Sequence, residues 1–152
     1  VEERVTVSKA LFACYRSLAE FLAVKGGIGM DIRRAYLEDD RDWLTSIAEE
    51  QIPVCLEELE QYHDFREKIW FHECKPNGYE TIDIRQGGLH ARLVSAQKRI
   101  LAYLDGEITE IPELLEERLP YKPSAPEGLQ KPFNMNNWCN IVTAGNMGTG
   151  TI

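Results

Sequence analysis

Apolar residues recur every three or four positions through most of the chain, which is the spacing of one face of an α-helix. The first series falls within residues 5–24, a range that contains neither glycine nor proline. Its members are Leu11, Tyr15, Leu18 and Leu22. The Gly26-Gly27 pair predicts the end of this helix, because glycine commonly terminates helices, and a short helix is expected over residues 30–37.

Residues 41–74 form the longest amphipathic stretch, and Asp39-Asp40 supplies a cap and a first-turn acid at its start. Pro53 falls inside this stretch. Because proline lacks a backbone N–H, it is expected to kink the helix or to divide it in two. The apolar positions of the stretch are Trp43, Ile47, Val54, Cys55, Leu59, Tyr62 and Ile69.

A turn is predicted at residues 75–78, where Lys-Pro-Asn-Gly combines several helix-ending signals. A further helix is expected over residues 79–104, beginning at Tyr79 or Ile82. The Gly87-Gly88 pair disturbs its first part, since each glycine costs a helix roughly 1 kcal/mol. The pair indicates either a closely packed backbone or a loop that precedes the helix.

The composition changes beyond residue 119, where proline, glycine and asparagine become frequent and exclude a long helix. Before that point a short helix is expected over residues 111–119, with Pro112 in its first turn. Residues 120–152 are expected to form an irregular arm. This arm is expected to pack back onto the helices as an extended segment through Trp138, Ile141 and Val142.

These elements predict an all-α fold, namely an up-and-down bundle of three main helices with shorter helices and an irregular C-terminal arm. The length of 152 residues suits one domain with its own core and is too short for two ordinary domains. We therefore assign residues 1–119 to the helical bundle and residues 120–152 to the arm of the same single domain.

Charge and cysteine usage narrow the possible partners. The net charge of −8 and the scattered lysines and arginines argue against nucleic acid, and no apolar run reaches the roughly 18 residues of a membrane span. The cysteines are widely spaced and form no CxxC pair, which favours reduced thiols in a cytoplasmic protein and leaves disulfides as the alternative. They are Cys14, Cys55, Cys74 and Cys139.

The residues that could support catalysis do not form a recognisable site. His72 lies beside Glu73 and nine residues after His63, and neither spacing brings ligands together on one helix face, so neither a metal nor a cofactor is expected. Pairs of neighbouring carboxylates are numerous, but they fall at caps or on polar helix faces, where acids are solvated rather than catalytic. These pairs are Asp39-Asp40, Glu49-Glu50, Glu57-Glu58 and Glu116-Glu117.

The most distinctive region is the polar turn around residues 73–90, where aromatic and charged residues are concentrated. One interpretation is a helix–helix junction with buried ion pairs. The other is a surface that meets a neighbouring domain or forms the edge of a pocket, for which arginine and aromatic side chains are typical. The candidate residues are Trp70, Lys75, Asn77, Tyr79, Glu80, Asp83, Arg85, His90 and Arg92.

The same region resembles a known family. Residues 70–93, WFHECKPNGYETIDIRQGGLHARL, and residues 103–119, YLDGEITEIPELLEERL, are similar to the C-terminal helical domain of bacterial family 20 glycoside hydrolases. These enzymes are β-N-acetylhexosaminidases of the three-domain, streptococcal type. Residues 138–144, WCNIVTA, also resemble the end of that domain, whereas Cys74 and Ile111-Pro112 depart from its pattern.

The resemblance implies a non-catalytic accessory domain of a hydrolase that removes terminal N-acetylglucosamine or N-acetylgalactosamine. In such enzymes an adjacent Asp-Glu pair in a catalytic barrel performs the reaction, and no segment here has the strand–helix alternation of a barrel. The implied partner is therefore the barrel of the same polypeptide, with a homodimer also possible, and the chain by itself is expected to be inactive. The alternative function is a free-standing helical interaction or adaptor module.

Overall fold

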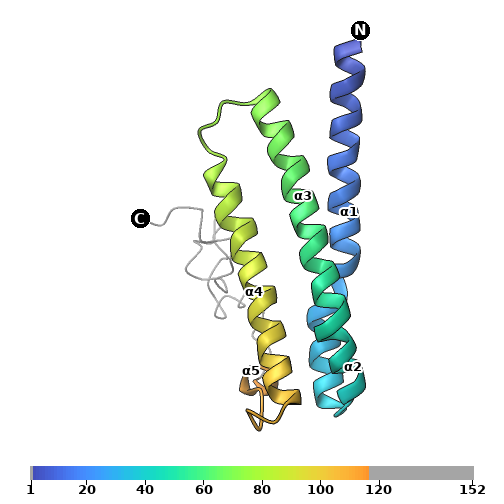
Figure 1. Cartoon of the computed structure of the whole chain (residues 1–152), viewed down its shortest axis with the longest axis vertical. Coiled ribbons are helices and arrows are strands. Elements are labelled where there is room, and N and C mark those ends of the chain that lie inside the picture. Colours follow the sequence, from blue (N-terminus) through green and yellow to red (C-terminus); the bar gives the residue numbers. More distant parts are fainter. Residues whose placement is uncertain (1, 117–152) are drawn as a thin grey trace, which may run out of the picture.

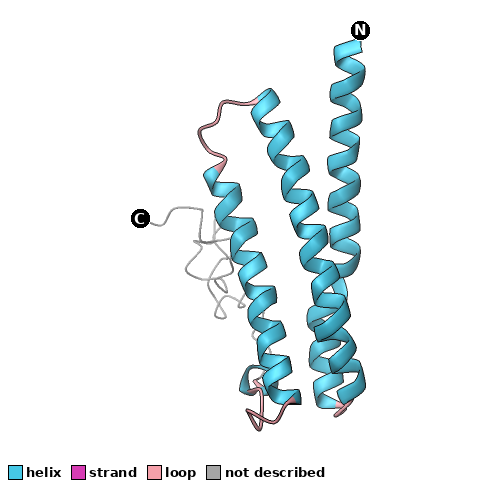
Figure 2. Cartoon of the chain, viewed as in Figure 1, coloured by secondary structure: helices cyan, strands magenta, loops and turns pink. Residues whose placement is uncertain are grey.

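The computed structural model describes residues 2–116, with side chains from residue 9 onward. Three long helices run up and down beside one another (Figure 1). Within this part of the chain every regular element is helical, which confirms the predicted all-α bundle (Figure 2). The elements are α1 (Glu2–Leu37), α2 (Arg41–Ser46), the π-helical turn η1 (Ile47–Gln51), α3 (Ile52–Glu73), α4 (Glu80–Leu104) and α5 (Pro112–Leu115).

Helix α1 is longer than predicted, because it continues through Gly26 and Gly27 to Leu37. The expected stop at this glycine pair was wrong. Packing explains the difference, since Ile28 and Ile32 are both buried in the core immediately after the glycines. Helical stability in proteins comes mainly from such packing, which here offsets the low helix propensity of glycine.

The long stretch after residue 40 is divided, as the proline predicts, but the irregularity precedes the proline as a π-helical turn. The backbone N–H of Ile52 donates to the carbonyl of Ile47, five residues earlier. Pro53 would donate to Ala48 in the same pattern but has no N–H. The side-chain amide of Gln97 on α4 donates to that Ala48 carbonyl instead, at 2.7 Å. Pro53 thus leaves the Ala48 carbonyl without a backbone donor, and Gln97 of α4 supplies one.

Helix α4 begins at Glu80 and contains no break at the glycine pair. Both sequence interpretations of Gly87-Gly88 were therefore wrong at Gly87, where an added Cβ would meet nothing within 4 Å. Neither a loop nor a closely packed backbone is present there. The missing side chain instead leaves room beside α3, and Gly87 lines a cavity described below.

The core is concentrated at the end of the bundle where α2, η1 and the C-terminal half of α4 meet (Figure 1). Helix α1 packs mainly along α3, while α4 contacts α2, η1 and α3. The side chains that are almost completely buried are Leu44, Ile47, Ile52, Cys55 and Ile100. They come from α2, η1, α3 and α4, and the buried α1 residues Phe21, Ile28, Ile32 and Ala35 belong to the same cluster, so the three long helices share a single core.

Polar contacts tie the chain together at the same end. The Asp40 carboxylate accepts from the backbone N–H of Trp43 at 2.9 Å, which confirms the predicted cap. Arg41 donates to the carbonyl of Leu104 at 2.7 Å and lies over the ring of Tyr103. A cation at this position complements the partial negative charge at the C-terminus of α4.

The remaining predictions concern the chain ends and the thiols. Helix α5 is shorter than the predicted 111–119, and the boundary at 119 and the arm at 120–152 lie outside the described residues. Cys14, Cys55 and Cys74 are free, as predicted, and Cys139 lies outside the described part. No helix among residues 2–116 is long and apolar enough to cross a membrane.

Candidate functional site

The turn between α3 and α4 is built on an aromatic cluster. Tyr79 is buried, and its ring lies 5.8 Å from that of Trp70 and 5.2 Å from that of Phe71. The indole N–H of Trp70 donates to the carbonyl of Lys75 at 2.9 Å. Gly78 has φ +104°, a conformation that favours glycine. The turn is therefore fixed by local contacts between the end of α3 and the start of α4.

A polar cavity of about 250 Å³ adjoins this cluster between α3 and α4. His63 Nε2 lies 2.9 Å from Asp83 Oδ1, which links the two helices across one end of the cavity. The remaining polar lining comes from Glu60, Gln86 and His90. The side-chain oxygen of Gln86 is buried and has no hydrogen-bond partner within the described part of the chain.

The sequence candidates lie in different parts of the structure. Trp70 and Tyr79 belong to the aromatic cluster, while Asp83 and His90 line the polar cavity. Glu80 accepts from the backbone N–H of Gly78 at 2.8 Å and so stabilises the turn. The side chains of Lys75, Asn77 and Arg85 are exposed, and the backbone carbonyl of Lys75 accepts from Trp70.

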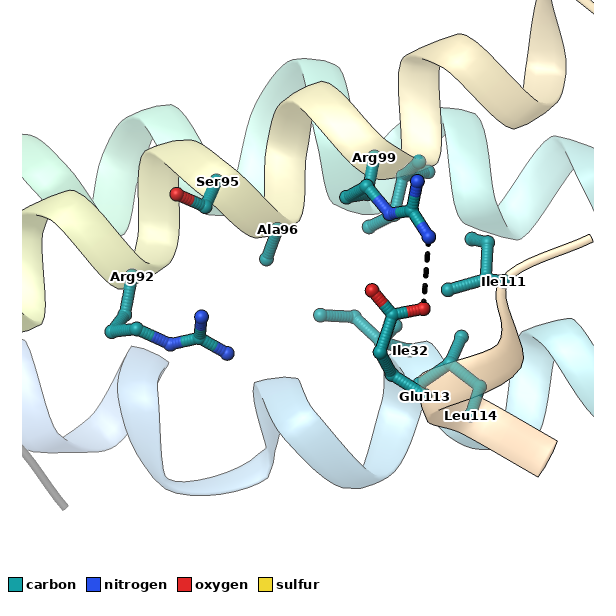
Figure 3. A pocket seen from close by; sticks show the side chains of 9 residues that line it. Ile32, Arg92, Ser95, Ala96, Arg99, Ile111, Glu113 and Leu114 are labelled. Atoms are coloured by element: carbon teal, nitrogen blue, oxygen red, sulfur yellow. Dashed lines mark hydrogen bonds and ion pairs between the residues drawn. The ribbon is translucent and has the colours of Figure 1, made fainter. Parts of the chain in front are cut away.

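The last candidate, Arg92, lies apart from the turn, in a second cavity of about 150 Å³ between α1, α4 and α5. Figure 3 shows Arg92 and Arg99 reaching from α4 into this hollow, while Glu113 reaches back from α5. Arg99 Nη2 donates to Glu113 Oε2 at 3.0 Å. This hydrogen bond lowers the pKa of the Glu113 carboxyl below its ordinary value and keeps it ionised.

Neither cavity contains an arrangement that explains a reaction. No group of three or more potential metal ligands is found in the part of the chain that the structure describes. His63 and Asp83 could bind a polar group, and the residues around them include the carboxylate of Glu60 and the imidazole of His90.

The buried phenol of Tyr79 makes the stability of this turn pH-dependent. Burial, helped by the Asp83 carboxylate, raises the pKa of Tyr79 to about 12 from the usual value near 10. The folded state therefore favours the neutral phenol. Its contribution is complete below pH 10 and is lost as the pH rises from 10 to 12.

We expect the free energy of unfolding to fall by up to about 2–3 kcal/mol over this interval because of Tyr79 alone. Urea unfolding of the unsubstituted chain and of its Tyr79→Phe variant at each pH isolates this contribution, since phenylalanine cannot ionise. Tyr15→Phe is the matched control at an exposed tyrosine. Equal declines in all three proteins would contradict the prediction.

The sequence did not predict that several residues of the two cavities lie together. His63 and Asp83 are 20 residues apart, so no local spacing links them. Arg92 and Arg99 are seven residues apart on one helix, a spacing that places both on the same face. That signal was present in the sequence, but the hollow itself depends on how α5 folds back.

The described residues thus define a small all-α bundle with a polar inter-helix cavity and an arginine-lined hollow. The model of the Glycoside Hydrolase 20C C-terminal domain family matches residues 1–133, and the chain belongs to this family. This confirms the resemblance found in the sequence. None of the curated proteins matches the chain.

Proposed function

We propose that this chain is the non-catalytic helical domain of a β-N-acetylhexosaminidase and that it packs through α1 against the catalytic barrel of the same polypeptide. Membership of a glycoside hydrolase domain family supports an accessory role in such an enzyme. The observation that carries the packing proposal is an apolar face of α1 that the bundle leaves exposed.

This face, called here the α1 stripe, consists of large apolar side chains at 37–74% exposure: Leu11, Phe12, Tyr15, Leu22 and Leu37. Helical geometry places them away from the buried residues of the same helix. Phe12 is two residues before buried Cys14, and Leu22 is one residue after buried Phe21. The stripe therefore lies on a different side of α1 from the buried residues that pack toward the rest of the bundle, and α1 is the helix at one side of the bundle in Figure 1.

The size of the exposed side chains makes the α1 stripe an unusual surface for an isolated domain. Large exposed apolar side chains that gather on one helix face are typical of sites that bind other proteins or domains, and Leu11, Phe12, Tyr15 and Leu22 lie within about three turns of α1. Full burial of a large apolar side chain stabilises by about 1.5–3 kcal/mol. Five such positions on one helix could therefore supply much of the free energy of a domain interface.

The first test compares hydrolysis of a chromogenic N-acetyl-β-glucosaminide by this chain and by its full-length parent. We expect hydrolysis by the parent and none by the chain. Hydrolysis by the chain at the parent's rate would overturn the non-catalytic role. Absence of hydrolysis by both proteins would overturn the assignment to a hexosaminidase and favour a free-standing adaptor.

The second test places Phe12→Glu and Leu22→Glu together in the full-length parent. Buried at an interface, the two carboxylates should lower the parent's melting temperature by several degrees and expose the junction between the domains to limited proteolysis. The matched control is Val54→Glu with Ile84→Glu, which makes the same changes at exposed sites on α3 and α4.

Equal effects of the two pairs would contradict packing through the α1 stripe. The first pair could instead convert a dimeric parent into a monomer while the junction between its domains stays resistant to proteolysis. That result would show that the stripe joins two copies of the protein. Light scattering distinguishes these results. The location of the barrel contact is thus tested separately from the activity.

A further inference from the structure

The hollow between α1, α4 and α5 concentrates positive charge on an acidic protein. Two guanidinium groups, Arg92 and Arg99, and one carboxylate, Glu113, give it a net charge of +1. The whole chain has a net charge of −8. A local excess of cation on such a background is a feature of anion-binding sites.

The guanidinium groups retain donors that nothing in the described residues uses. Arg99 bonds Glu113 through Nη2, while its Nε is buried without a partner. Arg92 has no hydrogen bond or ion pair within residues 9–116, although it points into the hollow (Figure 3). Arg92 is exposed, so water can meet its donors, whereas the Arg99 Nε carries the free-energy cost of a buried donor without an acceptor.

The lining selects among anions. Ser95 adds a hydroxyl, and the floor is apolar, formed by Ile32, Ile100 and Leu114. Phosphate would bring no apolar part to this floor. A monocarboxylate with a short hydrocarbon chain matches the charge, the apolar floor and the fork geometry of guanidinium donors.

We propose that this hollow binds a carboxylate group carried on a short aliphatic chain, held by the guanidinium groups of Arg92 and Arg99. The volume of about 150 Å³ equals roughly five water molecules, which suits a group of that size. Such a carboxylate is present in small organic acids and in the side chains of aspartate and glutamate. The proposal concerns this chain alone and does not depend on the hexosaminidase assignment.

The probe is sodium propionate, titrated into the whole chain at constant ionic strength with sodium chloride as the balancing salt. We expect side-chain NMR signals of Arg92 and Arg99 to shift with a Kd on the order of millimolar, because so small a ligand has few contacts. Inorganic phosphate should bind more weakly. Absence of any shift with propionate, or equal shifts with chloride, would overturn the proposal.

Two substitutions test the roles of the charges. Arg92→Gln should weaken propionate binding at least about fivefold, which corresponds to the loss of one charge-assisted hydrogen bond. Arg85→Gln makes the same change at an exposed site on α4 away from the hollow and should have no effect. Equal losses in these two variants would show a general charge effect and overturn the site.

Glu113→Gln should change the affinity for propionate in the opposite direction to Arg92→Gln. It removes the carboxylate that Arg99 now binds and raises the net charge of the hollow to +2, so propionate should bind more tightly. Weaker binding would overturn the proposal. Repeating the titration with the full-length parent identifies the source: retained binding indicates a free acid as ligand, and blocked binding indicates an acidic side chain of the parent.

Discussion

Replacing Ile100 by alanine should lower the free energy of unfolding by about 2–4 kcal/mol. Ile100 is 1% exposed on α4 and belongs to the core cluster that also contains Leu44 and Ile47. Truncation removes buried methyl groups and leaves a cavity that close-packed neighbours fill only in part. Chemical denaturation followed by circular dichroism at 222 nm measures the loss.

The matched control is Ile84→Ala, the same substitution in the same helix at a position that is 57% exposed. We expect a change within about 0.5 kcal/mol, since little burial is lost and alanine has the higher helix propensity. Comparable losses at the two positions would contradict the location of the core. A cost at Ile84 only in a protein that also contains the proposed barrel domain would indicate that α4 contacts that domain.

Gln97→Leu should cost about 1–3 kcal/mol because it leaves the carbonyl of Ala48 without a donor. Ala48 is fully buried, so water cannot replace the 2.7 Å hydrogen bond from the Gln97 amide. Leucine has a similar volume, which limits the change in packing. Urea unfolding of the variant measures this cost.

The cause of the cost is tested by combining Gln97→Leu with Pro53→Ala. Alanine at position 53 restores a backbone N–H that can donate to the carbonyls one turn earlier, so the Gln97→Leu substitution should cost less on this background. A double-mutant cycle gives the coupling. Strictly additive effects would show that the proline does not create the need for Gln97.

Much of the fold was predictable because the helices are amphipathic and are divided by strong local signals. The turn at 75–78 and the Asp40 cap depend on neighbouring residues, and both are present in the structure. The stop at Gly26 failed because it required knowledge of what Ile28 and Ile32 pack against. Local propensity is outweighed there by burial, which a single helix pattern does not reveal.

The first apolar series shows the same limit in another form. Leu11, Tyr15 and Leu22 have the spacing of a core face, but the structure leaves them exposed while Cys14 and Phe21 are buried. When one helix has two apolar faces, its sequence does not tell which face is buried, because that depends on the side on which α3 packs. The second face is the basis of the proposed domain contact.

The candidate site was predictable only where it is local. Trp70 and Tyr79 lie close in sequence, and the structure places them together. The link between His63 and Asp83 and the hollow around Arg92 depend on the relative positions of separate helices. The expected roles of the candidates at a domain interface remain predictions.

The uneven distribution of the core has a consequence for motion. No residue from Glu80 to Arg92 is buried, whereas Leu93 and Ile100 in the second half of α4 are. Local opening costs least where few apolar contacts must be broken. We therefore expect the first half of α4 to open more readily than the second half, with buried Tyr79 holding the turn before it, so that the polar cavity beside α3 is the part of the bundle whose width should change most easily.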